Sequence, residues 1–132
     1  MTANDDTDKL AATPGRPWRA SEETVEPVTD VVLILTTVPA GARTETIARS
    51  LVDERLAACV NVLAPMTSFY RWQGKIEQEE ERQVVIKTTL DRVAAVQTRL
   101  RDLHAYEVPE FLVLPVSDGS TGYLDWVLKE TR

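Results

Sequence analysis

Eight consecutive residues, VVLILTTV from Val31 to Val38, are all apolar or β-branched. A strand with one face in water alternates polar and apolar side chains, and this run does not alternate. It therefore predicts a strand that is buried on both faces. Pro39 and Gly41 end the run directly afterwards. The rest of the chain must supply a sheet around this strand and cover for its two faces.

The segment after this run alternates between helical and strand patterns. Apolar residues at helical spacing predict a helix over Thr44–Ala58. Strand composition returns at Cys59–Leu63, and aromatic and polar residues alternate over Thr67–Lys75. Gln83–Leu90 predicts another strand. Between Trp72 and that strand lies the acidic stretch GKIEQEEER, which predicts an exposed hairpin connection.

The C-terminal third continues the alternation. Asp91 is placed as an N-cap for a helix that runs to Leu103. Val108–Val116 predicts a last strand, and prolines near its ends indicate a position at the edge of the sheet. Apolar residues within Ser117–Arg132 predict a closing helix.

The resulting β-α-β-β-α-β order predicts an α+β, ferredoxin-like domain over residues 30–132, with an additional C-terminal helix. In this fold the helices lie on one face of an antiparallel sheet. The two middle strands are long for so small a domain. Strands that extend past their own sheet leave backbone groups that another chain can pair, which predicts an oligomer. Residues 1–29 are rich in Pro, Asp, Glu and Thr and predict a disordered or loosely ordered tail.

Composition limits the classes of function. The 132 residues carry a formal net charge of -6, which argues against binding to nucleic acid or to anionic membranes. The longest apolar run is far too short to span a bilayer. A single cysteine excludes an intramolecular disulfide framework and favours a reducing, cytoplasmic setting.

Cys59 and His104 are the residues that suit a soft or borderline metal such as copper or zinc. Taken alone, a cysteine in an apolar run is more often a small buried hydrophobe, and a loop histidine is more often solvated. No CxxC or HExxH spacing occurs, so one chain cannot build a closed structural metal site. A Cys–His nucleophile pair, as in a Cys-dependent transferase or hydrolase, is the least favoured alternative.

Aromatic residues and one lysine form the second group of candidates. Tyr70 and Trp72 are of the kind that line a core or a subunit interface. Lys87 lies inside an apolar strand, where an ammonium must extend to water, pair with a carboxylate or face a ligand. Glu107 and Glu110 are its natural partners on this reading.

Five blocks in fixed order carry a resemblance to a known family. They are LAACVNVL, SFYRWQGKIEQEEE, VVIKTT, HAYEVPEFLVLPV and GYLDWV, and together they resemble the CutA divalent-cation-tolerance family from about residue 31 to the C-terminus. The resemblance implies a ferredoxin-like subunit in a compact trimer, with the long strands pairing between subunits and a fold similar to PII signalling proteins. It also implies copper tolerance and divalent-cation binding, without an established enzymatic reaction.

The resemblance carries over residue by residue to the family's motifs. The matching positions are Cys59, Trp72, Gly74, Lys87, His104, Tyr106, Glu107, Pro109 and Glu110. The chain departs from the family at Ala105, where a proline is usual. It also has Thr36 and Thr37 where some relatives have a cysteine, and Leu103 where some have a second histidine.

These observations lead to one hypothesis and one alternative. The hypothesis is a cytoplasmic, non-enzymatic homotrimer that binds Cu(II) or another divalent cation, with no organic cofactor. The metal ligands are then His104 with Cys59 or Glu107, and the pocket is formed by Tyr70, Trp72, Lys87, Tyr106 and Glu107. The alternative is a PII-like regulatory module that binds an anionic small molecule or a partner protein.

Overall fold

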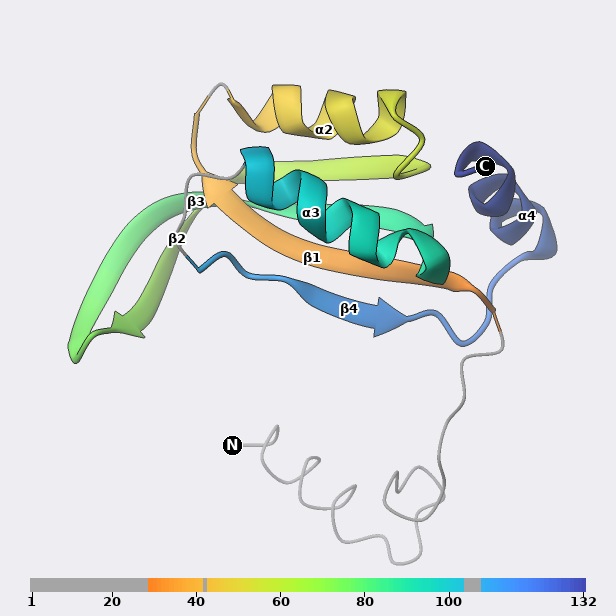
Figure 1. The fold of residues 1–132 in the computed structure, drawn as a ribbon. Helices are drawn as coiled ribbons and strands as arrows, with labels where there is room; N and C mark the ends of the chain where they lie inside the picture. The colour runs from red at the N-terminus through yellow and green to blue at the C-terminus, as the bar shows by residue number, and fades with distance from the viewer. Residues whose placement is uncertain (1–28, 42, 104–107) are drawn as a thin grey trace, which may run out of the picture.

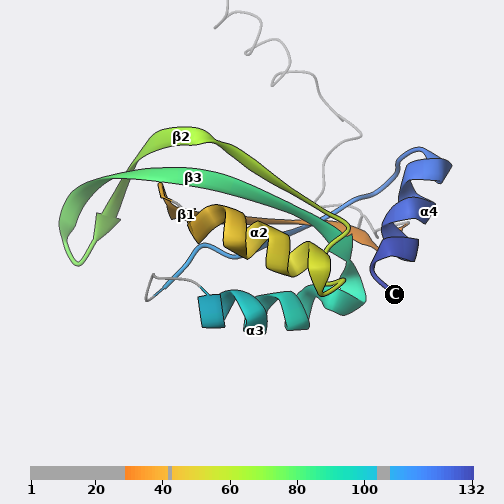
Figure 2. The same ribbon diagram turned by 90° about the horizontal axis from the view of Figure 1, so that it is seen from above.

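The computed structural model describes residues 29–41, 43–103 and 108–132. The elements are β1 (Val31–Pro39), α2 (Arg43–Asp53), β2 (Cys59–Trp72), β3 (Lys75–Thr89), the 3₁₀ turn η2 (Leu90–Arg92), α3 (Val93–Leu103), β4 (Leu112–Pro115) and α4 (Thr121–Glu130). The four strands form one antiparallel sheet in the order β2-β3-β1-β4. Helices α2 and α3 lie side by side on one face of it (Figures 1 and 2). The predicted ferredoxin-like α+β fold is confirmed.

The main core lies between the sheet and these two helices. Its buried members come from alternate positions of β1 and β3, from the inward faces of α2 and α3 and from the connection before β2, namely Val32, Ile34, Val38, Ile47, Leu51, Ala57, Val84, Ile86, Val96 and Leu100. A smaller cluster of Val31, Ala58 and Val127 fixes α4 at the end of the sheet. Both predicted helical periods therefore serve to bury one stripe of each helix.

The other face of β1 is less well covered than its sequence predicts. Leu33 and Leu35 alternate with the core residues and remain half-buried. The strand pairing sets Leu35 between Val85 and Leu112, and Leu33 beside Leu114. We call these five residues the apolar sheet face. Since neither α2 nor α3 lies over it (Figure 2), the prediction of burial on both faces is wrong for a single chain.

The β2–β3 hairpin projects beyond the other two strands (Figure 1). β1 pairs with β3 only from Glu81 onwards, whereas β2 pairs with β3 as far as Trp72 and Lys75. Gln73 and Gly74 close the hairpin with φ angles of 51° and 81°, as a two-residue type I′ turn requires. The acidic stretch was predicted to be a connection, but it belongs to β3, because only two residues are needed for the turn.

Two predicted boundaries are wrong for local reasons. Helix α2 stops at Asp53 rather than Ala58, because Arg55 adopts a left-handed φ of 59°. Its N–H bonds to the carbonyl of Val52, and Leu56 N–H bonds to that of Leu51, which together form a Schellman ending. Asp91 is not the N-cap of α3: it lies inside η2, where it accepts a hydrogen bond from the Thr89 hydroxyl.

The last strand and the N-terminal region complete the comparison. β4 is an edge strand, as its prolines predict, but it covers only Leu112–Pro115 of the predicted Val108–Val116. Thr29 attaches the start of the domain to β4's end, because its hydroxyl donates to the carbonyl of Val116 at 2.7 Å. The rest of the predicted tail lies outside the described residues. In the described ranges no helix is long and apolar enough to span a bilayer.

Candidate functional site

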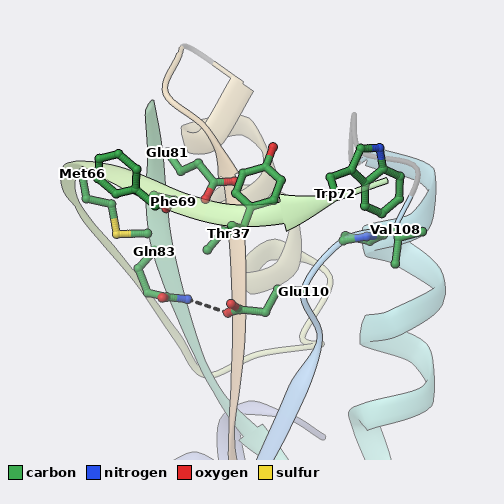
Figure 3. Close-up of a pocket in the computed structure, with 11 residues that line it drawn as sticks. Thr37, Met66, Phe69, Trp72, Glu81, Gln83, Val108 and Glu110 are labelled. Atoms are coloured by element: carbon green, nitrogen blue, oxygen red, sulfur yellow. Dashed lines mark hydrogen bonds between the residues drawn. The ribbon is translucent and has the colours of Figure 1, made fainter. Parts of the chain in front are cut away.

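A cavity of about 710 Å³ lies at the base of the projecting hairpin. Its walls come from the end of β1, the outer half of β2, the adjoining part of β3 and the segment before β4 (Figure 3). The lining residues are Thr37, Met66, Ser68, Phe69, Tyr70, Trp72, Glu81, Gln83, Val108, Pro109 and Glu110. Tyr70 and Trp72, both predicted for a ligand pocket, are among them.

A β-bulge in β2 determines which side chains reach this cavity. Val62 pairs with Val84, but Pro65 pairs with Arg82, so the register shifts between them. Before the shift, even-numbered residues of β2 face the helices; after it, they oppose odd-numbered residues of β3 and turn to the other face. Met66, Tyr70 and Trp72 thereby share a face with Glu81 and Gln83. The bulge thus places the aromatic residues beside the carboxylates.

Two glutamates and one glutamine are among the polar residues of the cavity. Glu81 is almost fully buried, with 6% of its surface exposed. Gln83 Nε2 donates to Glu110 Oε2 at 2.9 Å and to the carbonyl of Thr36 at 2.8 Å (Figure 3). Glu110 is therefore held toward β3 by a hydrogen bond. Neither lysine nor arginine is found among the described residues that line the cavity.

The pKa of Tyr70 reflects the burial and the charges around its phenol. Desolvation raises the pKa of its phenol above the ordinary value of 10.0, and the carboxylates of Glu79, Glu77 and Glu81 raise it further. Both effects disfavour the charged phenolate. Tyr70 therefore stays neutral at physiological pH, and its surroundings carry a negative potential, which attracts cations and repels anions.

The structure sets Lys87 and Cys59 apart from the cavity. They are cross-strand partners near the opposite end of β2 and β3. Lys87 Nζ lies 5.9 Å from the centroid of the Tyr123 ring, a cation–π arrangement with α4. Lys87 lies four positions after Gln83, or about 13 Å along an extended strand. The lysine thus contacts an aromatic ring rather than Glu110.

The remaining predicted site residues, His104, Tyr106 and Glu107, lie outside the described residues. Within the described ranges, no group of three or more His, Cys, Asp or Glu side chains is arranged to hold a metal ion. Sequence reasoning missed Glu81, Gln83 and Met66 as cavity residues. The signal for Glu81 was present, because it is an acidic residue directly before a buried strand, but the acidic run around it masked that position.

Comparison with known proteins gives consistent results. The model of the family described as CutA1 divalent ion tolerance protein matches residues 32–130. A divalent-cation tolerance protein CutA of Pectobacterium atrosepticum is 46% identical over 106 residues, which cover 80% of this chain and 96% of that protein.

Solved structures agree with the sequence comparison. The crystal structure of CutA from Xylella fastidiosa has a TM-score of 0.76 at 48% identity, covering 79% of this chain and all of that one. A protein of Archaeoglobus fulgidus, described as a periplasmic divalent cation tolerance protein CutA, has a TM-score of 0.74 at 33% identity over 77% of this chain and 99% of that chain. With a family model that matches three quarters of its length, the chain belongs to the CutA1 divalent ion tolerance protein family.

Proposed function

We propose that this protein is a non-enzymatic homotrimer that acts in divalent-cation tolerance by binding the cation, Cu(II) first, in or beside the cavity. The observation that carries the proposal is the charge of the cavity: Glu81 and Glu110 line it, and no lysine or arginine is found among its described lining residues. The names of its relatives, which refer to divalent-cation tolerance, support the same proposal.

The chain places its only histidine close to this cavity in sequence. His104 precedes Val108, a lining residue, by four positions, and four residues span at most about 14 Å. An imidazole nitrogen together with carboxylate oxygens is a donor set that Cu(II) accepts. Glu107 is a further proposed ligand. Cys59 lies too far along β2 to share a metal ion with Glu110 of the same subunit.

Two features support the proposed trimer. The apolar sheet face leaves Leu112 and Leu114 exposed by 53% and 39%. Beyond the end of β1, the side of β3 away from β2 has no strand partner over residues 75–79 of the described chain. Both an apolar face and unpaired strand groups are satisfied when copies of the chain associate. A trimer would also supply three copies of each metal ligand.

The charge of the cavity disfavours the alternative of an anion-binding regulatory module. An anion would have to approach two carboxylates, while Lys87, the lysine proposed to attract it, is directed toward Tyr123. We therefore retain cation binding. The single cysteine supports a cytoplasmic location as part of the same proposal.

Calorimetric titration with Cu(II) tests the metal role. We expect saturable binding by the wild type, at least tenfold weaker binding by His104→Ala, and wild-type binding by Glu80→Gln. Glu80 is a matched control because it is exposed and adjoins Glu81 on the opposite face of β3. Equal, negligible heats for the wild type and His104→Ala would remove the metal role.

A further inference from the structure

The cavity is larger and more aromatic than a site for a metal ion alone requires. Its volume of about 710 Å³ lies within the range of sites that take small organic molecules. Three aromatic residues, Phe69, Tyr70 and Trp72, line it, and the side chains of Tyr70 and Trp72 share the face of Glu81 and Gln83. Aromatic rings give a metal ion no ligand atoms of the kind it prefers, apart from the weakly basic phenol of Tyr70. The shape and the walls therefore fit an organic body.

The polar groups of the cavity determine which charge a bound organic molecule should carry. Glu81 is 6% exposed and lies on β3, while Glu110 reaches the cavity from the segment before β4. The bond from Gln83 holds Glu110 toward β3, so carboxylates from two different parts of the fold line the same cavity. A charged donor makes stronger hydrogen bonds to a carboxylate than a neutral donor does. The cavity therefore favours a positively charged hydrogen-bond donor.

Carboxylates and aromatic rings together recognise one class of ligand. An ammonium group is attracted both to a carboxylate and to the face of a ring, and tryptophan gives the strongest such attraction among the aromatic residues. We propose that this cavity is a binding site for an organic primary ammonium ion, with the ammonium group at Glu81 and Glu110 and the hydrocarbon body against Tyr70 and Trp72. The proposal does not depend on metal binding.

Three probes of similar shape test the charge requirement. Phenethylammonium is the cation, 2-phenylethanol the neutral analogue and phenylacetate the anion, each titrated calorimetrically into the full-length protein. EDTA is present throughout, so that bound metal cannot contribute and failure of the copper proposal leaves this test intact. We expect phenethylammonium to bind at least tenfold more tightly than 2-phenylethanol and phenylacetate not to bind. Equal affinities for the three, or no binding of the cation at millimolar concentration, would overturn the proposal.

Variants then test the assigned residues. Glu81→Gln and Trp72→Leu should each weaken phenethylammonium binding at least fivefold, while Glu80→Gln, on the other face of β3, should not change it. Because Glu81 is buried, Glu110→Gln serves as a second carboxylate variant if Glu81→Gln does not fold, as judged by circular dichroism. Two results together would overturn the proposal: the wild type does not bind phenethylammonium, and Trp72→Leu loses its oligomeric state. The aromatic residues would then belong to a subunit interface.

Discussion

Gln83 Nε2 donates a hydrogen bond of 2.9 Å to Glu110 Oε2, and this bond joins β3 to the segment that leads into β4. The same amide nitrogen donates to the carbonyl of Thr36 on β1 at 2.8 Å. One side chain therefore connects three segments that are far apart in sequence. It also keeps a carboxylate at the wall of the cavity.

Replacement of Gln83 by leucine should destabilise the protein. The change keeps the approximate size of the side chain but leaves the Thr36 carbonyl and the Glu110 carboxylate without this donor, at a cost of about 1–3 kcal/mol. Urea unfolding followed by circular dichroism measures the loss. Gln78→Leu is the control, because Gln78 is an exposed residue of the same strand. Equal stability of the two variants would show that the network contributes nothing.

Local sequence patterns were sufficient for the order of elements. The apolar run at Val31–Val38, the helical spacing up to Leu103 and the prolines around β4 each depend on short-range chemistry, and each was interpreted correctly in kind. The end of α2 was not, because Arg55 has a left-handed φ without being a glycine or an asparagine. Nothing in the residue type marks that position.

The site was less predictable than the fold. The bulge between Val62 and Pro65 decides which face Tyr70 and Trp72 occupy, and strand register depends on pairing with β3 rather than on β2 alone. Tyr70 and Trp72 were identified by their residue type and by the resemblance. Glu81 could not be distinguished from the other glutamates of its acidic run by sequence. It is buried, whereas Glu79 and Glu80 are exposed, because β1 begins to pair with β3 at Glu81.

Leu51 provides a test of the core between α2 and the sheet. It is fully buried, whereas the adjacent Val52 is 43% exposed on the same helix. Leu51→Ala removes buried methyl groups and leaves a cavity, so we expect the free energy of unfolding to fall by about 2–5 kcal/mol. Val52→Ala should change it by less than about 1 kcal/mol. Urea denaturation of both variants makes the comparison, and similar losses would contradict the assigned orientation of α2.

Asp91 should show a pH dependence with a defined sign. The Thr89 hydroxyl donates to Asp91 Oδ1 at 2.6 Å, and this bond, followed by the charges of Arg132 and Arg92, lowers the pKa of Asp91 below its ordinary value of 3.8. A lowered pKa in the folded state stabilises the protein above pH 3.8, and the contribution disappears as the pH falls through the folded-state value. Since 64% of the Asp91 side chain is exposed, solvent screening keeps the effect below about 1 kcal/mol.

Replacement of Thr89 by valine separates the hydrogen bond from the shape of the side chain. We expect the pKa of Asp91 to rise toward 3.8 in Thr89→Val, as measured by NMR titration of its carboxyl carbon. The control is Thr67→Val, because Thr67 is exposed on β2, away from Asp91. An unchanged Asp91 pKa in Thr89→Val would assign the shift to the arginines instead.

The apolar sheet face makes the final prediction, on the proposed trimer. Leu112 lies on this face beside Leu35, and it is 53% exposed in the single chain. Leu112→Glu should therefore cost the subunit little, but in an oligomer it would bury a carboxylate against leucine side chains, which is strongly unfavourable. We expect the wild type to sediment as a trimer at micromolar concentration and Leu112→Glu to sediment as a monomer or with at least tenfold weaker association.

Val52→Glu is the matched control for this experiment, because Val52 is a similarly exposed apolar residue on α2, on the other side of the sheet. It should remain trimeric, since a charge there stays in water. If Leu112→Glu and the wild type sediment alike, the apolar sheet face is not the surface through which subunits associate. If the wild type is itself a monomer, the unpaired strand groups of the hairpin are satisfied by water, and the argument from strand length fails as well.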